Sequence, residues 1–414
     1  MSATSAPRAR AITIDAARQL LSDGIEPLKQ SVVRPLKASL GLLAAEDIHS
    51  TIDLPRSLNA AVDGYGVLAK THTDKPSTVF RVVGVARAGH PYEGVIGAGE
   101  AIEIYTGAVM PIGPDSVAMH EYCQRDGDKV VINQTLAPGN NVRPPGENLA
   151  KGEVVITRGM RTTAALIGQI AAAGYKEVAV QQTLRVGLLS TGVEIIDAGN
   201  KLGNGQIFDS NRPMLQALLS DPMLEVFDHG IVSDKLDSLI TAFEEALTNH
   251  DVVISSGGAS DGIEDHTQAA MQAVGVDCAF WRLAMKPGRP MAAGQRGQKL
   301  IFCLPGNPVA AFVCTKLLIM PLLIRLAGGI VTAPLNLYIP AGFSHKKSAG
   351  RAEYLRAKVA DGALGQEIQL HGRKGAGVLS SLTGADGLVE IPFDNNGVEP
   401  GMPLNFLPFA DRGL

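Results

Sequence analysis

The sequence predicts a multidomain α/β protein in which a doubly wound parallel sheet is joined to an inserted mostly-β domain and a C-terminal β domain. Strand and helix patterns alternate from residue 183 to about residue 332, and such alternation implies right-handed crossovers and a parallel sheet. Short β-branched runs broken by glycine and proline fill residues 51–150, and β patterns return after residue 333. The 414 residues, 45% of them hydrophobic, provide core material for two to four domains of roughly 150 residues each.

The elements follow in order along the chain. TIDAARQLLSDGIEPL carries apolar residues at helical spacing after Thr13, which predicts an amphipathic helix with a threonine N-cap. In the insert, the predicted strands lie in STVFRVVGVARAG, GEAIEIYTGAVMPIG, SVAMHEYC and DKVVINQ. The alternating region is LRVGLLS, RPMLQALLSD, LEVFDHGIV, KLDSLITAFEEALTNH, DVVIS, EDHTQAAMQAVG, AFWRLA and KLIFCLPGNP, which leads into a last long helix. The helix predicted in KLDSLITAFEEALTNH has one apolar face, formed by Leu236, Leu239, Ile240, Phe243 and Leu247. RAEYLRAKVA and DGLVEIPF are the β patterns of the C-terminal domain.

Charge and cysteine content argue against several classes of protein. A net charge of −4 with scattered lysines and arginines provides no basic patch for nucleic acid or an anionic membrane. Four cysteines without a C-x-x-C pair and nine histidines without H-x-x-H spacing disfavour zinc sites and disulfide frameworks. The N-terminus lacks the apolar core of a signal peptide, and Lys316, Pro321 and Arg325 interrupt the most apolar helix. We therefore expect a cytoplasmic protein whose partners are small molecules or proteins.

Asp63 is a lone carboxylate in an apolar stretch. SLNAAVDGYGVLA places it between Val62 and the turn-prone Gly64-Tyr65-Gly66, where we expect it to be partly buried. A carboxylate removed from water needs hydrogen-bond donors or a cation, or else its pKa changes. Two interpretations are open: Asp63 accepts backbone N–H groups within a turn, or it belongs to a binding site.

The loop ISSGGAS, residues 254–260, is a candidate anion site. Ligands of a doubly wound sheet bind beyond the carboxyl ends of its strands, and this loop follows a strand and precedes a helix. Its adjacent glycines let backbone N–H groups approach an oxyanion, which the helix N-terminus also attracts. The alternative is a glycine turn required only for packing. NAD and P-loop chemistry are disfavoured, because the loop is neither G-x-G-x-x-G nor a Walker A sequence.

Two further loops bring cations near a helix end. In LPGNP, Asn307 suits an N-cap and Pro308 the first turn of a helix, although capping alone explains both residues. Lys286 and Arg289 of MKPGRP follow another strand end and are candidates to face the same helix end. Two cations beside one helix N-terminus favour a dianion as ligand.

Several loops also carry carboxylates: Asp63, Glu194, Asp234 and Asp265. If these groups converge, repulsion raises some of their pKa values unless a divalent cation neutralises them, and oxygen-only ligands indicate Mg²⁺. For Asp234 the alternative is an ordinary N-cap in Ser-Asp, and for Asp265 an ordinary first-turn helix carboxylate.

Taken together, these loops resemble the molybdopterin molybdenumtransferase family, the MoeA type that includes the gephyrin E domain. The resemblance spans roughly residues 10 to 410 and rests on motifs in family order: NAAVDGYGV, EIYTGAVMP, NVRPPGENL, LLSTGVEI, GNGQIFDSNR, VVISSGGAS, MKPGRP, LPGNPVA, GRAEYLR and GVLSSLTGADGL. It implies an L-shaped homodimer whose active cleft lies between the α/β domain of one subunit and the β insert of the other. It also implies insertion of molybdate into adenylated molybdopterin, with hydrolysis of the adenylate, release of AMP and assistance from Mg²⁺. The molybdopterin adenylyltransferase and downstream molybdoenzyme chaperones are implied partners.

The resemblance assigns roles residue by residue. The catalytic region comprises Asp63, Thr106, Glu194, Asp234 and Asp265. Of these, the implied Mg²⁺ ligands are Glu194, Asp234 and Asp265. The positions matching the part that holds the nucleotide and pterin phosphates are Ser256, Gly257, Gly258 and Ser260, and those matching the PGNP turn are Pro305 and Pro308. The positions associated with the molybdate pocket are Lys286, Arg289, Arg356 and Ser380.

The same resemblance divides the chain into five parts. They are an N-terminal helix packing on the α/β domain (1–30), a linking domain (31–50 and 151–182), the inserted β domain (51–150), the α/β molybdopterin-binding domain (183–332) and a β-barrel-like C-terminal domain (333–414). Four residues depart from the family motifs: Asn148 and Val193 where Asp is usual, Arg289 where Lys is usual, and Ala310 where Ser is usual. Each lost charged hydrogen bond weakens binding by roughly 1 to 3 kcal/mol.

These departures leave two alternatives to the transferase. One is a divergent paralogue that binds the pterin or acts as a scaffold with little turnover. The other is an enzyme that performs the preceding adenylation, because the resemblance also extends to the α/β domain of that pathway enzyme.

Overall fold

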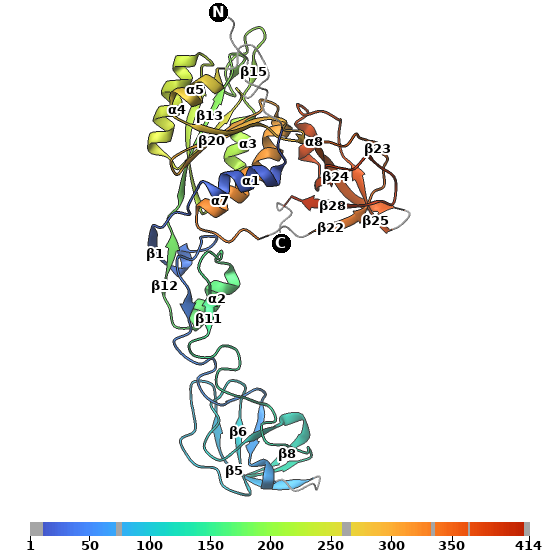
Figure 1. The fold of residues 1–414 in the computed structure, drawn as a ribbon. Helices are drawn as coiled ribbons and strands as arrows, with labels where there is room; N and C mark the ends of the chain where they lie inside the picture. Colours follow the sequence, from blue (N-terminus) through green and yellow to red (C-terminus); the bar gives the residue numbers. More distant parts are fainter. Residues whose placement is uncertain (1–10, 72–76, 259–265, 333–335, 363–364, 410–414) are drawn as a thin grey trace, which may run out of the picture.

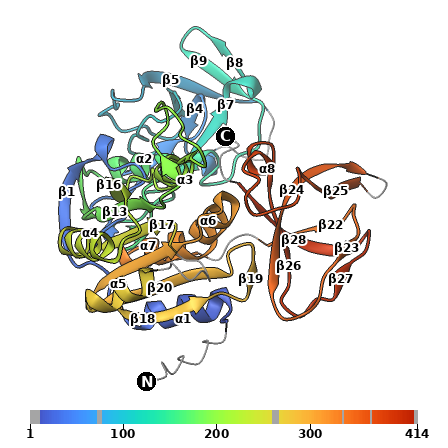
Figure 2. The same cartoon turned by 90° about the horizontal axis from the view of Figure 1, so that it is seen from above.

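The computed structural model describes residues 11–71, 77–258, 266–332, 336–362 and 365–409. These residues form an elongated, L-shaped chain (Figure 1). The α/β domain and the C-terminal β domain lie side by side at one end, the inserted β domain lies at the other end, and a narrow linking region joins them (Figures 1 and 2). The predicted multidomain α/β architecture is confirmed.

The central sheet of the α/β domain contains parallel and antiparallel strands. In spatial order it comprises β16 (Leu224–Val232), β13 (Leu184–Thr191), β17 (Val252–Ser256), β21 (Lys299–Leu304), β20 (Pro290–Arg296) and β18 (Asp277–Arg282). The first four are parallel, as the alternation predicted, whereas β20 and β18 extend the sheet antiparallel. The MKPGRP segment was predicted to be a loop, whereas β20 begins at its final proline, Pro290.

Helices cover both faces of this sheet and bury its apolar strands. They are α1 (Ile14–Asp23), α3 (Asn211–Leu218), α4 (Leu236–Asn249), α5 (Thr267–Ala273), α6 (Pro308–Cys314), the π-helical turn η4 (Thr315–Ile319) and α7 (Met320–Leu326). The Thr13 hydroxyl accepts a hydrogen bond from Ala16 N at 3.2 Å, so the predicted N-cap is confirmed. The predicted apolar face of α4 is also confirmed, with Leu239, Phe243 and Leu247 fully buried.

The continuous helix Pro308–Leu326 is long and apolar enough to span a membrane by length and composition alone. It lies within the protein, where 61% of its most apolar window is buried and residues such as Val313, Leu318 and Leu323 belong to the main hydrophobic core. Burial in a core accounts for its composition.

The inserted domain is built on one sheet. In spatial order its strands are β7 (Ser116–Met119), β4 (Gly64–Val67), β6 (Glu100–Ile104), β5 (Thr78–Ala86), β9 (Lys129–Ile132) and β8 (Cys123–Asp126). The link consists of helix α2 (Ala164–Ala172) and the strand pairs β1 (Ser31–Pro35) with β12 (Glu177–Gln181) and β2 (Ile48–His49) with β11 (Val154–Ile156). The pair β3 (Asn59–Ala60) with β10 (Val142–Arg143) belongs to the inserted domain, because Ala60 and Val142 pack in its core. Short 3-10 turns are η1 (Leu36–Ala38), η2 (Ala69–Thr71) and η3 (His120–Tyr122).

The C-terminal domain shares a sheet with the α/β domain. Its strands are β24 (Ala352–Gly362), β26 (Gly387–Ile391), β28 (Pro403–Pro408), β22 (Leu337–Pro340) and β25 (Gly365–Leu370), and β19 (Met285–Lys286) joins them from the α/β domain. The C-terminal domain also contains α8 (Ser380–Thr383) and the strand pair β23 (His345–Lys346) with β27 (Gly397–Val398). The pair β14 (Ile195–Ile196) with β15 (Ile207–Phe208) follows β13 in the α/β domain. Parallel pairing of β19 with β24 brings the start of the MKPGRP segment against the GRAEYLR segment.

Candidate active site

The carboxyl ends of four parallel strands lie at one edge of the central sheet. Ser190 of β13 is in register with Ser256 of β17, and Ser256 with Leu304 of β21, while Thr191 pairs with Val232 of β16. The loops predicted to carry chemistry start at these positions. The sheet register therefore brings LLSTGVEI, ISSGG, LPGNP and the Asp234 loop together.

The glycines after β17 fit tightly against the neighbouring strand end. Gly257 has φ +92° and its N–H donates to Leu304 O at 3.1 Å, and a Cβ at this position would lie 2.2 Å from Thr191 O. Gly258 has φ +74°, and a Cβ there would lie 2.3 Å from Thr267 Oγ1. Packing alone thus requires glycine here, which supports the alternative of a glycine turn; an anion site at the same loop stays a prediction. Ser260 lies outside the described residues.

Asn211, which was not among the predicted site residues, connects the ISSGG and LPGNP loops at this edge. Its buried amide donates to Ser256 Oγ and to Gly306 O, both at 2.8 Å. Asn211 is the first residue of α3, and its position in the motif GNGQIFDSNR was the available signal. It fixes the ISSGG and LPGNP loops relative to each other.

Two of the three predicted Mg²⁺ ligands are described. Asp234 is not the N-cap of α4, because Lys235 occupies that position. Instead, Asp234 Oδ1 accepts a hydrogen bond from Thr191 Oγ1 at 3.3 Å. Glu194 is exposed, and its carboxylate folds back toward β13, where a Cβ at Gly192 would lie 2.7 Å from Oε2. The third ligand, Asp265, lies outside the described residues. Carboxylates are the ligand type that suits Mg²⁺, which commonly uses one or two of them together with waters and substrate phosphates.

Within the described part of the chain, no group of three or more His, Cys, Asp or Glu side chains is arranged to hold a metal ion. The magnesium site therefore stays a prediction.

A basic pocket of about 160 Å³ lies between the α/β and C-terminal domains. Lys286 and Arg356, both predicted for the molybdate pocket, line it together with His345, His371 and Lys374. The buried Arg356 guanidinium donates from Nε to Ser381 Oγ at 2.9 Å and from Nη2 to the Arg373 and Gly375 carbonyls. Burial lowers the pKa of Arg356.

Of the other residues predicted for the molybdate pocket and the PGNP turn, some are exposed and some are buried. Ser380 is exposed at the start of α8, and it is the buried Ser381 whose hydroxyl contacts Arg356. Arg289 is exposed. Pro305 is buried before the turn, and Pro308 begins α6 behind the N-cap residue Asn307, although the Asn307 side chain makes no capping hydrogen bond.

The basic pocket adjoins the LPGNP turn. Val309 N, in the first turn of α6, donates to Ala376 O of the loop that closes the pocket, at 3.0 Å. A Cβ at Gly377 in the same loop would lie 3.3 Å from Asn307 Oδ1. The C-terminal domain thus meets the α/β domain beside the carboxyl edge of the central sheet.

Asp63 and Thr106 form a separate cluster on the inserted domain. Asp63 Oδ1 accepts hydrogen bonds from Thr106 N and Thr106 Oγ1, both at 2.7 Å, and these bonds, the backbone one first, lower the pKa of Asp63. The expectation of a partly buried Asp63 was wrong, because the carboxylate is exposed beside β4. The sheet that contains β4 and β6 lies at one end of the elongated molecule, and the sheet that contains β13 and β20 lies at the other end (Figure 1).

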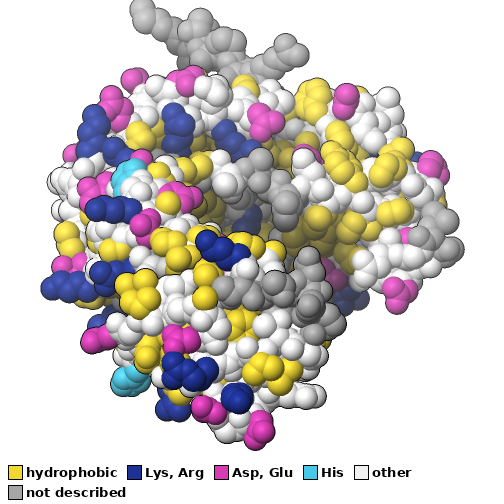
Figure 3. All heavy atoms as spheres, turned by 90° about the horizontal axis from the view of Figure 1, so that it is seen from below, with side chains coloured by type: hydrophobic (Ala, Val, Ile, Leu, Met, Phe, Trp, Pro, Cys, Tyr) yellow, Lys and Arg dark blue, Asp and Glu magenta, His cyan; other side chains and the backbone are white. Residues whose placement is uncertain are grey.

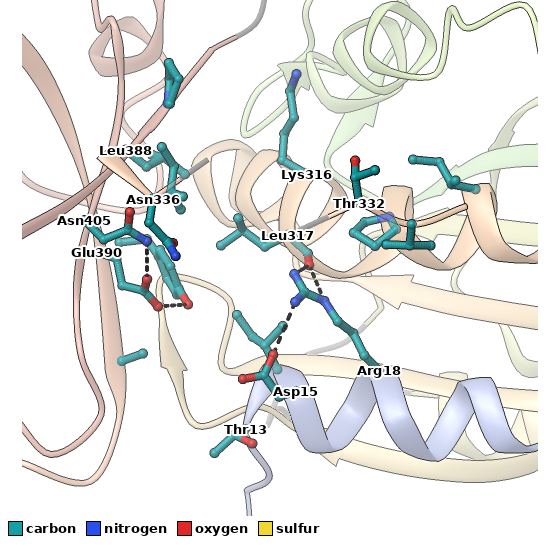
Figure 4. Close-up of a pocket in the computed structure, with 18 of the residues that line it drawn as sticks. Thr13, Asp15, Arg18, Lys316, Leu317, Thr332, Asn336, Leu388, Glu390 and Asn405 are labelled. Carbon is teal, nitrogen blue, oxygen red and sulfur yellow. Dashed lines mark hydrogen bonds and ion pairs between the residues drawn. The ribbon is translucent and has the colours of Figure 1, made fainter. Parts of the chain in front are cut away.

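A larger cavity of about 1090 Å³ lies on another side of the junction, between α1, the helix Pro308–Leu326 and the C-terminal sheet. Arg18 bridges Asp15 at 3.2 Å and Leu317 O at 2.9 Å, while Tyr354 Oη and Asn405 Nδ2 donate to Glu390 (Figure 4). None of the predicted site residues lines this cavity.

The surface and the four departures carry little additional signal. On the face seen in Figure 3, acidic and basic side chains are interspersed rather than gathered by sign. Val193 is 78% exposed and Asn148 is exposed, whereas Ala310 is buried within α6, where a serine hydroxyl would need an internal partner.

The doubly wound sheet, the inserted β domain and the C-terminal β domain define the class: a multidomain α/β protein with a basic pocket beside the carboxyl edge of its sheet. Family models match nearly the whole chain: "MoeA N-terminal region (domain I and II)" over residues 12–174, "Probable molybdopterin binding domain" over 187–325 and "MoeA C-terminal region (domain IV)" over 338–409. The molybdopterin molybdenumtransferase of Haemophilus influenzae is 33% identical over 401 residues, covering 96% of this chain and 98% of that protein. The corresponding protein of Staphylococcus aureus is 29% identical over 375 residues, covering 90% of each.

Solved structures agree with these matches. The crystal structure of the molybdopterin biosynthesis moeA protein from Pyrococcus horikoshii OT3 has a TM-score of 0.85 at 27% identity, covering 97% of this chain and all of that one. A second structure of a moeA protein from Pyrococcus horikoshii has a TM-score of 0.77 at 30% identity. The chain belongs to the MoeA family of molybdopterin molybdenumtransferases, enzymes of molybdenum cofactor biosynthesis.

Proposed function

We propose that this chain inserts molybdate into adenylated molybdopterin, with hydrolysis of the adenylate and release of AMP. The observation that carries the proposal is the basic pocket beside the glycine-lined edge of the central sheet. The pocket suits a small dianion because Lys286 and Arg356 line it, and the edge suits phosphate groups because glycine lets a ligand approach the backbone closely. A pyrophosphate-linked substrate and molybdate can therefore lie next to each other.

The chain's own residues supply binding and orientation. The loop at Ser256, Gly257 and Gly258 holds the phosphates, while Lys286 and Arg356 attract molybdate. Fixed cations and N–H groups stabilise the negative charge that develops in the transition state. Glu194, Asp234 and Asp265 are the residues that would hold Mg²⁺, which would supply positive charge to neutralise the substrate phosphates.

The separation of the two clusters supports a homodimer. Asp63 and Thr106 lie on the inserted domain, at the opposite end of the chain from the glycine loop (Figure 1). A second copy, arranged antiparallel about a two-fold axis, brings the inserted domain of each subunit to the sheet edge of the other. In this arrangement each cleft takes residues from both subunits, and two-fold symmetry produces two equal clefts.

The localisation proposed is the cytoplasm, and the proposed partners are the enzyme that adenylates molybdopterin and the chaperones of molybdoenzymes. The scaffold alternative is not favoured, since the relatives that cover nearly the whole chain are named as transferases. Adenylation activity is tested by ATP consumption with molybdopterin in the absence of molybdate.

The decisive experiment is a reconstitution with the full-length protein. We expect AMP release when adenylated molybdopterin, molybdate and Mg²⁺ are all present, and a product that activates an apo-molybdoenzyme. The matched control omits molybdate. Absence of both AMP and active cofactor, with a folded dimeric protein, would contradict the proposal.

A further inference from the structure

Glu353 is a buried carboxylate without a predicted role that contacts two residues of the basic pocket. It lies on β24 in parallel register with Lys286 of β19, and only 3% of its surface is exposed. Its Oε1 lies 3.3 Å from Lys286 Nζ and its Oε2 lies 2.9 Å from His345 Nε2. Lys286 and His345 both line the pocket. One carboxylate thus connects two walls of the pocket.

The protonation pattern of this cluster follows from its hydrogen bonds. Burial raises the pKa of Glu353, but the hydrogen bond from His345 and the charge and hydrogen bond of Lys286 outweigh burial, so the net pKa is lowered and the group is ionised. An ionised carboxylate only accepts hydrogen bonds, so His345 Nε2 carries the hydrogen that it donates. The Lys286 ammonium has three N–H donors, and one of them points to Glu353. The other two are free to bind an anion.

Lys286 needs such an anchor because half of its side chain is exposed. A lysine with four rotatable bonds loses considerable rotamer entropy when it binds a ligand in one orientation. A buried acceptor that is itself fixed by His345 removes part of that cost before the anion arrives. Against this benefit, a carboxylate near the pocket repels an anion, so the two effects predict opposite results when Glu353 is removed.

We propose that Glu353 is a positioning residue: together with His345 it holds the Lys286 ammonium toward the pocket, and so sets the affinity for the oxyanion substrate. This inference rests on the proposed function, because it names the molybdate side of that reaction. Glu353 touches no substrate itself and acts only through Lys286.

The test is a double-mutant cycle in the full-length protein. We expect Glu353→Ala to raise the KM for molybdate about tenfold with little change in the KM for adenylated molybdopterin, the loss typical of one charge-assisted hydrogen bond. In a Lys286→Ala background, Glu353→Ala should add nothing further, because its effect passes through Lys286. Glu353→Gln keeps an acceptor for Lys286 and should restore most of the affinity. A merely structural role would not produce this selective, non-additive pattern.

Glu390 provides the matched control. It lies on the neighbouring strand β26, accepts hydrogen bonds from Tyr354 and Asn405, and lines the other cavity. Glu390→Ala should leave the KM for molybdate unchanged. A lower KM for molybdate in Glu353→Ala or Glu353→Gln would overturn the proposal, because it would show that the carboxylate competes with the anion. Equal effects on both substrates, or additive effects with Lys286→Ala, would also overturn it.

Direct titration separates this inference from the proposed function. Calorimetry with tungstate as the probe measures anion affinity without turnover. If the wild-type protein releases no AMP yet Glu353→Ala weakens tungstate binding about tenfold, the proposed function fails and the positioning role stands. If AMP release is normal and tungstate affinity is unchanged in both Glu353 variants, the positioning role fails alone. Should Glu353→Ala not fold, the Glu353→Gln variant decides by the sign of its effect.

Discussion

The two halves of the proposed cleft are built in opposite ways. At the sheet edge, the groups expected to meet the ligand are strand ends and glycines fixed by register, and Gly257 has no room for a Cβ against Thr191. On the inserted domain, Asp63 is exposed and held by hydrogen bonds from Thr106. The first half depends on the whole domain, while the second depends on a few local contacts. Substitutions at the edge should therefore damage stability and activity together, and those at Asp63 should damage activity alone.

The largest expected effect is that of Asp63→Asn. We expect turnover to fall about 100-fold, a loss typical of removing one electrostatic group from an active site. Stability and dimer formation should be unchanged, because the carboxylate is exposed. AMP release, thermal unfolding and sedimentation measure the three quantities. Asp126→Asn, an exposed carboxylate at the end of β8, is the control and should be active.

Mixing two inactive variants tests whether the two halves of the cleft come from different subunits. Asp63→Asn and Asp234→Asn are each expected to be inactive, since they damage opposite halves of the cleft. After subunits are exchanged, one of the two clefts in each mixed dimer is intact, so about a quarter of the activity should return. If mixing restores nothing while mixed dimers form, the two halves do not meet across the dimer.

At the sheet edge, Gly257→Ala should cost stability as well as activity. We expect a loss of about 3 kcal/mol in the free energy of unfolding, from left-handed backbone strain plus the clash with Thr191 O. Gly199→Ala is the matched control, because its φ is +91° but no atom lies within 4 Å of a Cβ there. It should cost only about 1 kcal/mol. Urea denaturation of both variants isolates the clash, and equal losses would show that backbone strain alone requires the glycine.

The same contrast explains what the sequence could predict. Periodicity predicted β13, β17 and the buried face of α4, because parallel strands and their covering helices leave strong apolar patterns. Periodicity did not predict that β20 pairs antiparallel with β21 and with β18, because the direction of pairing depends on contacts between strands and not on the pattern within one strand. Motif order carried the family, and the family models match in that order.

Site residues were harder to predict where a side-chain contact decides the role. Val62 and Tyr65 suggested burial of Asp63, yet the turn before β4 turns the carboxylate outward. The contacts of Asn211 with Ser256 and of Glu353 with Lys286 could not be predicted, because these partners are 45 and 67 residues away, and only the motif GNGQIFDSNR drew attention to Asn211. The motif could not show whether Ser380 or Ser381 contacts Arg356, because that depends on the orientation of α8, which buries Ser381 and exposes Ser380.

The acid side of the stability profile should show the Glu353 cluster. The pKa of Glu353 in the folded state is lowered from its ordinary value of 4.5, so its contribution is present at neutral pH and is lost as the pH falls through the folded pKa, below 4.5. We expect Glu353→Gln to lower the free energy of unfolding by about 1 kcal/mol at neutral pH. The difference from wild type should shrink as the pH falls below 4.5. Urea titrations across this range measure it, and Glu46→Gln, at an exposed position, is the control.

The smallest expected effect distinguishes Ser381 from Ser380. Ser381 is 1% exposed, accepts from Arg356 Nε and donates to Val378 O at 2.6 Å, so Ser381→Ala should cost about 1 kcal/mol and raise the KM for molybdate about threefold by loosening Arg356. Ser380→Ala removes an exposed hydroxyl and should change stability by less than about 0.5 kcal/mol. Steady-state kinetics with varied molybdate decide between them. A raised KM for molybdate in Ser380→Ala with normal kinetics in Ser381→Ala would restore Ser380 as the residue that binds the oxyanion, and would show that α8 turns when the pocket is filled.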